Sequence, residues 1–158
     1  MGHRVFSAVL FASLLAGPMA CTSASYADPQ DSIVIENSGS TNTLGYRIIV
    51  SADGQASFES GNSHGRERLP ADLLSRLKYD VMMAQPLSHV RSAATCMKPA
   101  SFGTSIFVSL GAERTADLTC PASPKGEALK SDAEEIAGFL KLASVPRRPG
   151  GGVLPGMP

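Results

Sequence analysis

The chain has 158 residues and carries 14 basic and 14 acidic side chains, which gives a formal net charge of zero at pH 7. A balanced chain without a basic stripe does not attract phosphate backbones, so the composition argues against nucleic acid as a partner. With no Trp, three Tyr and six Phe, the chain is expected to bury a modest core of aliphatic side chains.

Residues 1–27 predict an export signal. His3 and Arg4 form a short basic start, and an apolar run from Val5 to Ala16 follows. That run is shorter than the roughly 20 residues that span a bilayer, which favours a removed signal peptide over a membrane helix. No second long apolar run follows Ala27, which argues against a polytopic membrane protein.

Two processing sites compete at the end of this segment. Ser25-Tyr26-Ala27 fits the small-x-small rule of signal peptidase and would leave a periplasmic or secreted chain that begins at Asp28. Alternatively, the residues around Cys21 resemble a bacterial lipoprotein site, and an acyl chain on Cys21 would anchor the protein to a membrane. Both hypotheses place the folded part outside the cytosol.

Residues 28–43 are expected to form a leader that includes a short edge strand from Ser32 to Glu36. The first hairpin is predicted directly after it. Apolar and polar residues alternate from Leu44 to Ser51 and again from Gln55 to Ser60. Asp53-Gly54 lies between these segments, and this dipeptide suits a tight hairpin because both positions tolerate a positive φ.

The segment from Ser60 to Arg68 is polar and contains glycine, so it is expected to form a loop. A helix is predicted after it, because Pro70 suits the first helical position, where a missing N–H costs nothing. Apolar residues then recur at helical spacing, namely Leu73, Leu74, Leu77, Val81 and Ala84. Pro86 ends this helix, since the residue before a proline is pushed out of the α region.

A second hairpin is predicted after a weakly patterned connection from Leu87 to Ala100. Residues alternate from Ser105 to Leu110, Gly111 to Glu113 suits a turn, and the alternation resumes from Arg114 to Cys120. Pro121 has no N–H to donate and should end the returning strand.

Cys96 and Cys120 bracket this hairpin, and they are the two cysteines that remain if Cys21 leaves with the signal. An even pair suits an oxidising compartment, so a disulfide is predicted. It would close a loop of about 25 residues and contribute about 3 to 4 kcal/mol by restricting the unfolded chain. The alternative is a pair of separate buried thiols.

A second helix is predicted from its cap and its apolar stripe. Ser123 is the expected N-cap and Pro124 the first helical residue. The stripe consists of Leu129, Ala133, Ile136 and Leu140. Three acidic residues are expected to face solvent instead, namely Asp132, Glu134 and Glu135. Pro146 should end the helix, and residues 143–158 form a Pro/Gly-rich tail that is expected to be disordered.

The two halves of the chain resemble each other. Gly45 to Ser51 matches Gly103 to Ser109 in its glycine, its apolar positions and its final serine, and each segment opens a hairpin that leads into a helix. The favoured fold is therefore one α+β domain over residues 44–142. We expect a two-layer sandwich in which an antiparallel sheet of four or five strands carries two helices on one face.

Gly61 to Gly65 matches the G-x-S-x-G pattern of a hydrolase nucleophile elbow around Ser63. The elbow needs a strand that turns directly into a helix, with an acid and a histidine downstream. Here the strand belongs to a hairpin, the helix begins several residues later, and His89 is the only later histidine. We therefore expect a loop without catalytic residues; a small hydrolase that uses Ser63 and His64 is the alternative.

No metal site or cofactor is predicted. His64 and His89 lack companions at the short spacings of structural zinc sites, so we expect them in solvated loops. Cys96 and Cys120 lack C-x-x-C spacing, and Lys98 is the only basic neighbour that could lower a thiol pKa. A thiol-redox enzyme is kept as an alternative on these cysteines.

Over residues 31–142, the order strand, hairpin, helix, hairpin, helix with a late disulfide resembles small exported bacterial domains of unknown function. It is also similar to the hairpin-helix units of secreted β-lactamase-inhibitory proteins. The resemblance lies in the layout and carries no individual functional residue. It implies a small α+β domain that acts by binding, in the manner of an inhibitor.

The sequence therefore predicts a noncatalytic exported envelope protein that binds a protein or cell-surface component. The expected contact surface is the exposed sheet face or the segment from Ser60 to Arg68, with His64, Arg66 and Arg68 as candidate contact residues. A structural lipoprotein anchored through Cys21 is the third hypothesis.

Overall fold

The computed structural model describes residues 31–99 and 103–142. The predicted signal peptide, Cys21, both processing sites and the predicted tail at 143–158 lie outside these residues. The described elements are β1 Ile33–Asn37, β2 Tyr46–Val50, β3 Gln55–Ser60, β4 Ser63–Arg68, α1 Ala71–Ala84, a 3-10 turn η2 Leu87–His89, β5 Ile106–Leu110, β6 Glu113–Arg114 and α2 Pro124–Phe139.

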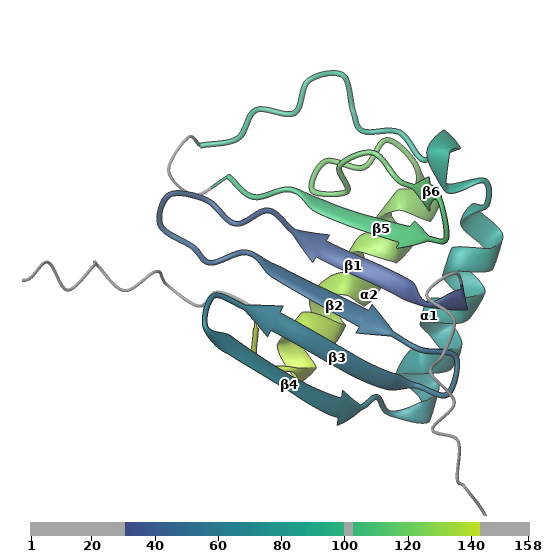
Figure 1. The fold of residues 1–158 in the computed structure, drawn as a ribbon. Coiled ribbons are helices and arrows are strands. Elements are labelled where there is room, and N and C mark those ends of the chain that lie inside the picture. The colour runs from purple at the N-terminus through teal and green to yellow at the C-terminus, as the bar shows by residue number, and fades with distance from the viewer. Residues whose placement is uncertain (1–30, 100–102, 143–158) are drawn as a thin grey trace, which may run out of the picture.

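The strands form one antiparallel sheet in the order β4-β3-β2-β1-β5-β6, and both helices pack behind it (Figure 1). The predicted α+β class is confirmed. The sheet has six strands instead of the four or five expected, because the predicted loop after β3 contains a further strand.

Strand β1 lies in the middle of the sheet, so its predicted place at an edge was wrong. It pairs with β2 on one side and with β5 on the other. Ile35 is opposite Ile48 in β2 and Val108 in β5, and all three side chains are fully buried. The two segments that resemble each other in sequence thus flank the same central strand.

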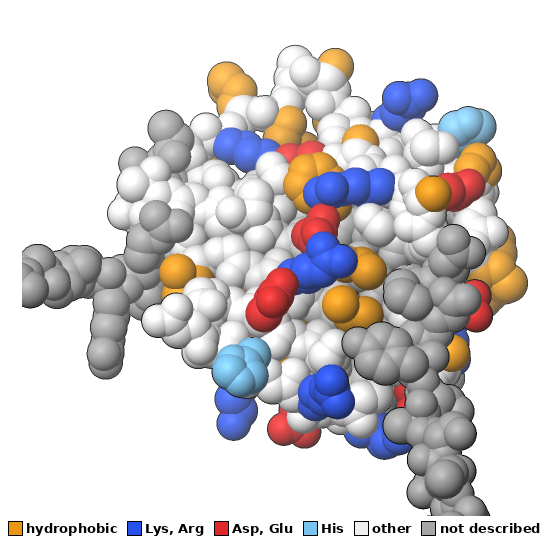
Figure 2. All heavy atoms as spheres, viewed as in Figure 1, with side chains coloured by type: hydrophobic (Ala, Val, Ile, Leu, Met, Phe, Trp, Pro, Cys, Tyr) orange, Lys and Arg blue, Asp and Glu red, His pale blue; other side chains and the backbone are white. Residues whose placement is uncertain are grey.

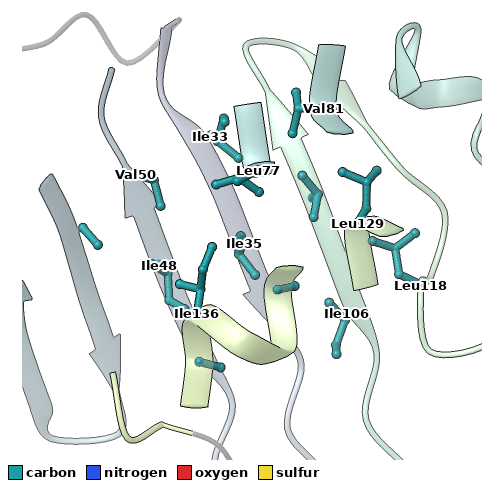
Figure 3. Close-up of a cluster of buried hydrophobic side chains, with 14 of the residues drawn as sticks. Ile33, Ile35, Ile48, Val50, Leu77, Val81, Ile106, Leu118, Leu129 and Ile136 are labelled. Carbon is teal, nitrogen blue, oxygen red and sulfur yellow. The ribbon is translucent and has the colours of Figure 1, made fainter. Parts of the chain in front are cut away.

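The core lies between the sheet and the helices. Ile33 and Ile35 of β1 and Ile48 and Val50 of β2 point toward the helix layer (Figure 3). The helices meet them with one buried stripe each, Leu73, Leu77, Val81 and Ala84 from α1 and Leu129, Ala133, Ile136 and Ala137 from α2. Because all these side chains are aliphatic, the core has the composition that the sequence predicted.

Three helix boundaries follow the predicted signals, but α2 ends at Phe139 and not at Pro146, because Lys141 leaves the helical region with a φ of 58°. Ser123 caps α2, where its Oγ accepts a hydrogen bond from the Gly126 N–H at 3.2 Å, and Pro124 is the first helical residue. Helix α1 begins one residue after Pro70 and ends at Ala84, two residues before Pro86. The Ser123 hydroxyl satisfies a backbone donor that the first helical turn leaves free.

The returning strand of the second hairpin is much shorter than predicted. β6 contains only Glu113 and Arg114, although Arg114 to Cys120 was expected to pair. Beyond Arg114 the bonds to β5 are irregular. The Thr115 and Leu118 N–H groups donate to the carbonyls of Val108 and Ile106 at 3.0 and 2.8 Å, while Thr115 Oγ1 and Asp117 Oδ1 accept from the N–H groups of Val108 and Ile106 at 3.1 and 3.2 Å. These bonds satisfy the outer edge of β5 without a regular ladder.

Cys96 and Cys120 form the predicted disulfide, with their Cα atoms 5.7 Å apart. The bond joins the connection after η2 to the end of the irregular segment that follows β6. Next to it, the Ala93 N–H donates to the Cys120 carbonyl at 2.8 Å. A disulfide is typical of proteins that fold in an oxidising compartment.

Candidate interaction surface

One face of the sheet is not covered by the helices. The side chains on the core face alternate along each strand with side chains on this second face, which we call the open face. The open face carries Val34 and Glu36 from β1, Arg47 and Ile49 from β2, Ser57 and Glu59 from β3, His64 and Arg66 from β4, and Phe107 and Ser109 from β5. Figure 2 views the molecule from this side.

A row of charged residues crosses the open face. The register places His64 opposite Glu59, Glu59 opposite Arg47, Arg47 opposite Glu36, and Glu36 opposite Phe107. Basic and acidic side chains alternate in a diagonal line over the strands (Figure 2). The pairs Glu59–Arg47 and Arg47–Glu36 join opposite charges, and such cross-strand pairs stabilise neighbouring strands.

Glu36 is the centre of this row. Its Oε1 accepts from Arg47 at 2.7 Å, and its Oε2 lies 3.0 Å from Nη2 of Arg114. The Arg114 guanidinium also stacks on the Phe107 ring, 4.1 Å from the ring centroid. These groups surround a shallow hollow of about 230 Å3 that includes Tyr46 in its lining. The two arginine side chains are about half exposed, so the hollow presents oriented guanidinium groups to solvent.

Apolar side chains lie beside the charged row. Val34 and Ile49 are opposite each other in β1 and β2, and both are only half buried although they belong to central strands. Phe107 is half buried on the neighbouring strand β5. Protein interfaces commonly combine an apolar centre that contains aromatic residues with arginine and a polar rim. The open face has this arrangement.

The three predicted contact residues, His64, Arg66 and Arg68, lie in strand β4 and not in a loop. The segment from Ser60 to Arg68 was therefore predicted wrongly as a loop: only the turn residues Gly61 and Asn62 separate β3 from β4. Arg68 donates to the carbonyl of Asp53 at 2.7 Å, which fixes its side chain at the end of the hairpin. All three residues are exposed at an edge of the sheet.

The G-x-S-x-G segment has no elbow geometry. Ser63 is the first residue of β4 and pairs with Ser60 across the turn, and helix α1 begins only at Ala71. Gly65 lies against Phe58, and a Cβ at that position would come within 2.5 Å of the Phe58 ring. The glycine is thus explained by packing inside the hairpin.

Among the described residues, no group of three or more His, Cys, Asp or Glu is arranged to hold a metal ion. His64 is exposed in β4, and His89 is exposed at the end of η2. Cys96 and Cys120 are joined in the disulfide, so neither carries a free thiol in this structure. Lys98 is bound to the Asp117 carboxylate and to the Thr104 carbonyl, and not to a sulfur.

A polar cluster between the helices was missed by the sequence analysis. Asp132 was expected to face solvent, but it is 1% exposed and accepts from Nε of Arg76 at 2.7 Å. The same guanidinium also pairs with Glu135. Burial raises the pKa of the Asp132 carboxyl, with a further rise from the neighbouring Asp80, while Arg76 lowers it. The cluster joins α1 to α2.

The chain matches no protein-family model and no curated protein sequence. In the described part of the chain, neither helix is long and apolar enough to cross a bilayer.

Proposed function

We propose that this is a noncatalytic, exported protein of the bacterial envelope that acts by binding another protein through the open face of its sheet. The observation that carries the proposal is the patch formed by Val34, Ile49 and Phe107 beside the Glu36–Arg47–Arg114 group. Half-buried apolar residues and oriented arginines on one uncovered sheet face form a surface suited to a protein partner.

The Cys96–Cys120 disulfide supports the exported location, because such bonds persist outside the reducing cytosol. We propose a periplasmic or secreted chain processed before Asp28. Acylation of Cys21 is the alternative, and it would hold the same binding face close to a membrane. Metabolic labelling with a radioactive fatty acid distinguishes the two, since only a Cys21-processed chain takes up the label.

Affinity capture tests the proposed function. The exported chain is used as bait in an extract of the envelope of the cells that produce it, and bound proteins are compared between variants by quantitative mass spectrometry. Arg47→Glu places a second carboxylate beside Glu36 and should remove the partner from the captured set. Lys125→Glu reverses a charge on an exposed residue of α2 and should retain it.

An unchanged captured set with Arg47→Glu, or no protein that is specific for the wild-type bait, contradicts the proposal. Both variants must remain folded at the temperature of the capture, shown by a cooperative unfolding transition that begins above it, which excludes a loss of fold as the cause. The alternative of a small hydrolase is tested separately with ester and peptide substrates, where an activity lost in Ser63→Ala would support it.

A further inference from the structure

Strand β4 forms a long free edge of the sheet. The order of the strands places it at one end, while the other end is β6, which has only two residues. β4 has six residues, no proline, and exposed side chains at every position except Gly65. In the described part of the chain no strand pairs with its outer side. Proteins usually shorten, cover or interrupt such edges, because the free backbone groups can pair with another chain.

The register shows which backbone groups are free. The Leu69 N–H donates to the Gly54 carbonyl at 3.0 Å, which is a hydrogen-bonded position next to the β3–β4 ladder. Hydrogen-bonded and non-bonded pairs alternate along antiparallel strands. Ser63, Gly65 and Glu67 therefore bond to β3, and the N–H and C=O groups of His64, Arg66 and Arg68 point outward.

The same three residues carry the side chains that β4 places on the open face. Arg68 is engaged with Asp53. For Arg66 and His64, no side-chain hydrogen bond or ion pair is found among the residues described here. Arg66 lies opposite Ser57, which offers no charge. The free edge thus combines outward donors and acceptors with an unneutralised positive side chain.

A second copy of the chain is a poor occupant of this edge. An antiparallel pair of β4 strands that uses the outward-facing residues places Arg66 opposite Arg66, Arg68 or His64 of the other copy. None of these registers supplies a negative partner, and like charges directly opposite each other are destabilising. The complement of this edge is a strand with carboxylates at alternate positions.

We propose that the free edge of β4 accepts an added strand from the partner protein, an extended segment with Asp or Glu at alternate positions opposite Arg66 and Arg68. Main-chain hydrogen bonds to the outward groups would supply affinity, and the ion pairs would select the partner, as in other cases of strand addition. This inference rests on the proposed function as a protein-binding domain and names the chemistry of the segment that is bound.

The test uses a fluorescein-labelled peptide of about six residues with Glu alternating with Val and Thr, a length that matches β4. Binding to the full exported chain is measured by fluorescence anisotropy. A peptide with Lys in place of Glu should bind about tenfold more weakly, because both cross-strand pairs change from attraction to repulsion. Methylation of the peptide amides that face β4 should abolish binding while its charges stay the same.

Three variants of the protein complete the test. Arg66→Glu should lower the affinity for the Glu peptide and raise the affinity for the Lys peptide. A loss of folding cannot produce this reversal. Edge strands tolerate proline where the missing N–H faces away from the sheet. Arg66→Pro removes one outward N–H and no bond to β3, so it should lower the affinity for both peptides. Arg91→Glu, at an exposed position outside the sheet, should leave both affinities unchanged.

No binding of the Glu peptide up to about 1 mM, or binding that survives amide methylation, overturns the inference. The inference is also overturned if the wild type and Arg66→Glu each bind the Glu peptide and the Lys peptide with equal affinity. If these results appear while affinity capture still depends on Arg47, strand addition is wrong and the proposed function stands. If capture also fails, the proposed function is wrong as well.

Discussion

Asp117 is expected to make the free energy of unfolding fall at low pH. Its carboxylate pairs with Lys98 and accepts from the Ile106 N–H at 3.2 Å and from the Thr119 N–H and hydroxyl at 3.0 and 2.8 Å. Burial raises the pKa of this carboxyl, but the hydrogen bonds from Lys98 and Thr119 lower it more, to about 2. Asp117 thereby fastens the disulfide-linked connection to the outer edge of β5.

The magnitude follows from the difference between the folded and unfolded states. The pKa of Asp117 is about 2 in the folded protein, against an ordinary value of 3.8. This difference corresponds to a contribution of at most about 2.4 kcal/mol to the free energy of unfolding. The side chain is 22% exposed, so screening by solvent reduces this to about 1 to 2 kcal/mol. Because the folded pKa is lowered, the contribution is present above pH 3.8 and is lost as the pH falls through about 2.

Urea unfolding between pH 2 and pH 7 measures this contribution. Asn at position 117 keeps an oxygen acceptor for the Ile106 and Thr119 N–H groups but does not titrate. Between pH 5 and pH 2, the free energy of unfolding of the wild type should therefore fall by about 1 to 2 kcal/mol more than that of Asp117→Asn. Glu134→Gln, a change at an exposed residue of α2, should keep the wild-type slope. Equal slopes for wild type and Asp117→Asn would refute the assigned role of the carboxylate.

Three further predictions concern the core, the disulfide and the helix interface. Ile35→Ala should lower the free energy of unfolding by about 2 to 5 kcal/mol, because the side chain is fully buried between both neighbouring strands and the helices; a loss below about 1 kcal/mol in urea unfolding would argue against this packing. Replacing Cys96 and Cys120 together by Ser should cost about 3 to 4 kcal/mol, measured against wild type without reductant, and no difference would mean that the bond is not formed. Since the pKa of Asp132 is raised, its proton stabilises the fold at low pH, and stability is lost as the pH rises from 3.8 through the raised value. Asp132→Asn should remove this loss and keep its hydrogen bond to Arg76, and a variant with the wild-type pH slope would contradict the burial of the charge.

The elements with a strong local pattern could be predicted from the sequence. Strands β2 and β3 alternate apolar and polar residues around Asp53-Gly54, and Gly54 has the positive φ of 87° that this turn requires. The stripes of α1 and α2 recur at helical spacing and are buried. Each of these elements buries one face, so its apolar residues recur at a regular spacing that predicts the type of element.

Strand order and strand β4 could not be predicted in the same way. The place of β1 depends on pairing with β5, which lies far along the chain, although its apolar residues at both Val34 and Ile35 are typical of a central strand. Strand β4 has no β-branched or aromatic residue. It forms because it pairs along its whole length with β3, which overrides its weak local preference.

The burial of Asp132 could not be predicted from the sequence alone. It lies three positions after Leu129 and one before Ala133, so its place on the buried stripe was visible in the spacing. Its charge favoured a solvated position, since aspartate is rarely buried without a partner. The partner, Arg76, comes from the other helix, and only the packing of α1 against α2 brings the two together.

Under the proposed function, the sheet side of the molecule, and not the helix side, meets a protein partner. Photo-crosslinking in the cells that produce the protein tests this directly, with one photoreactive residue per variant at Ser57 or Arg66 on the open face and at Met83 or Lys125 on the helices. Covalent adducts with a protein are expected from Ser57 and Arg66 only. Adducts from Met83 or Lys125 alone, or from none of the four positions, would contradict the proposed function.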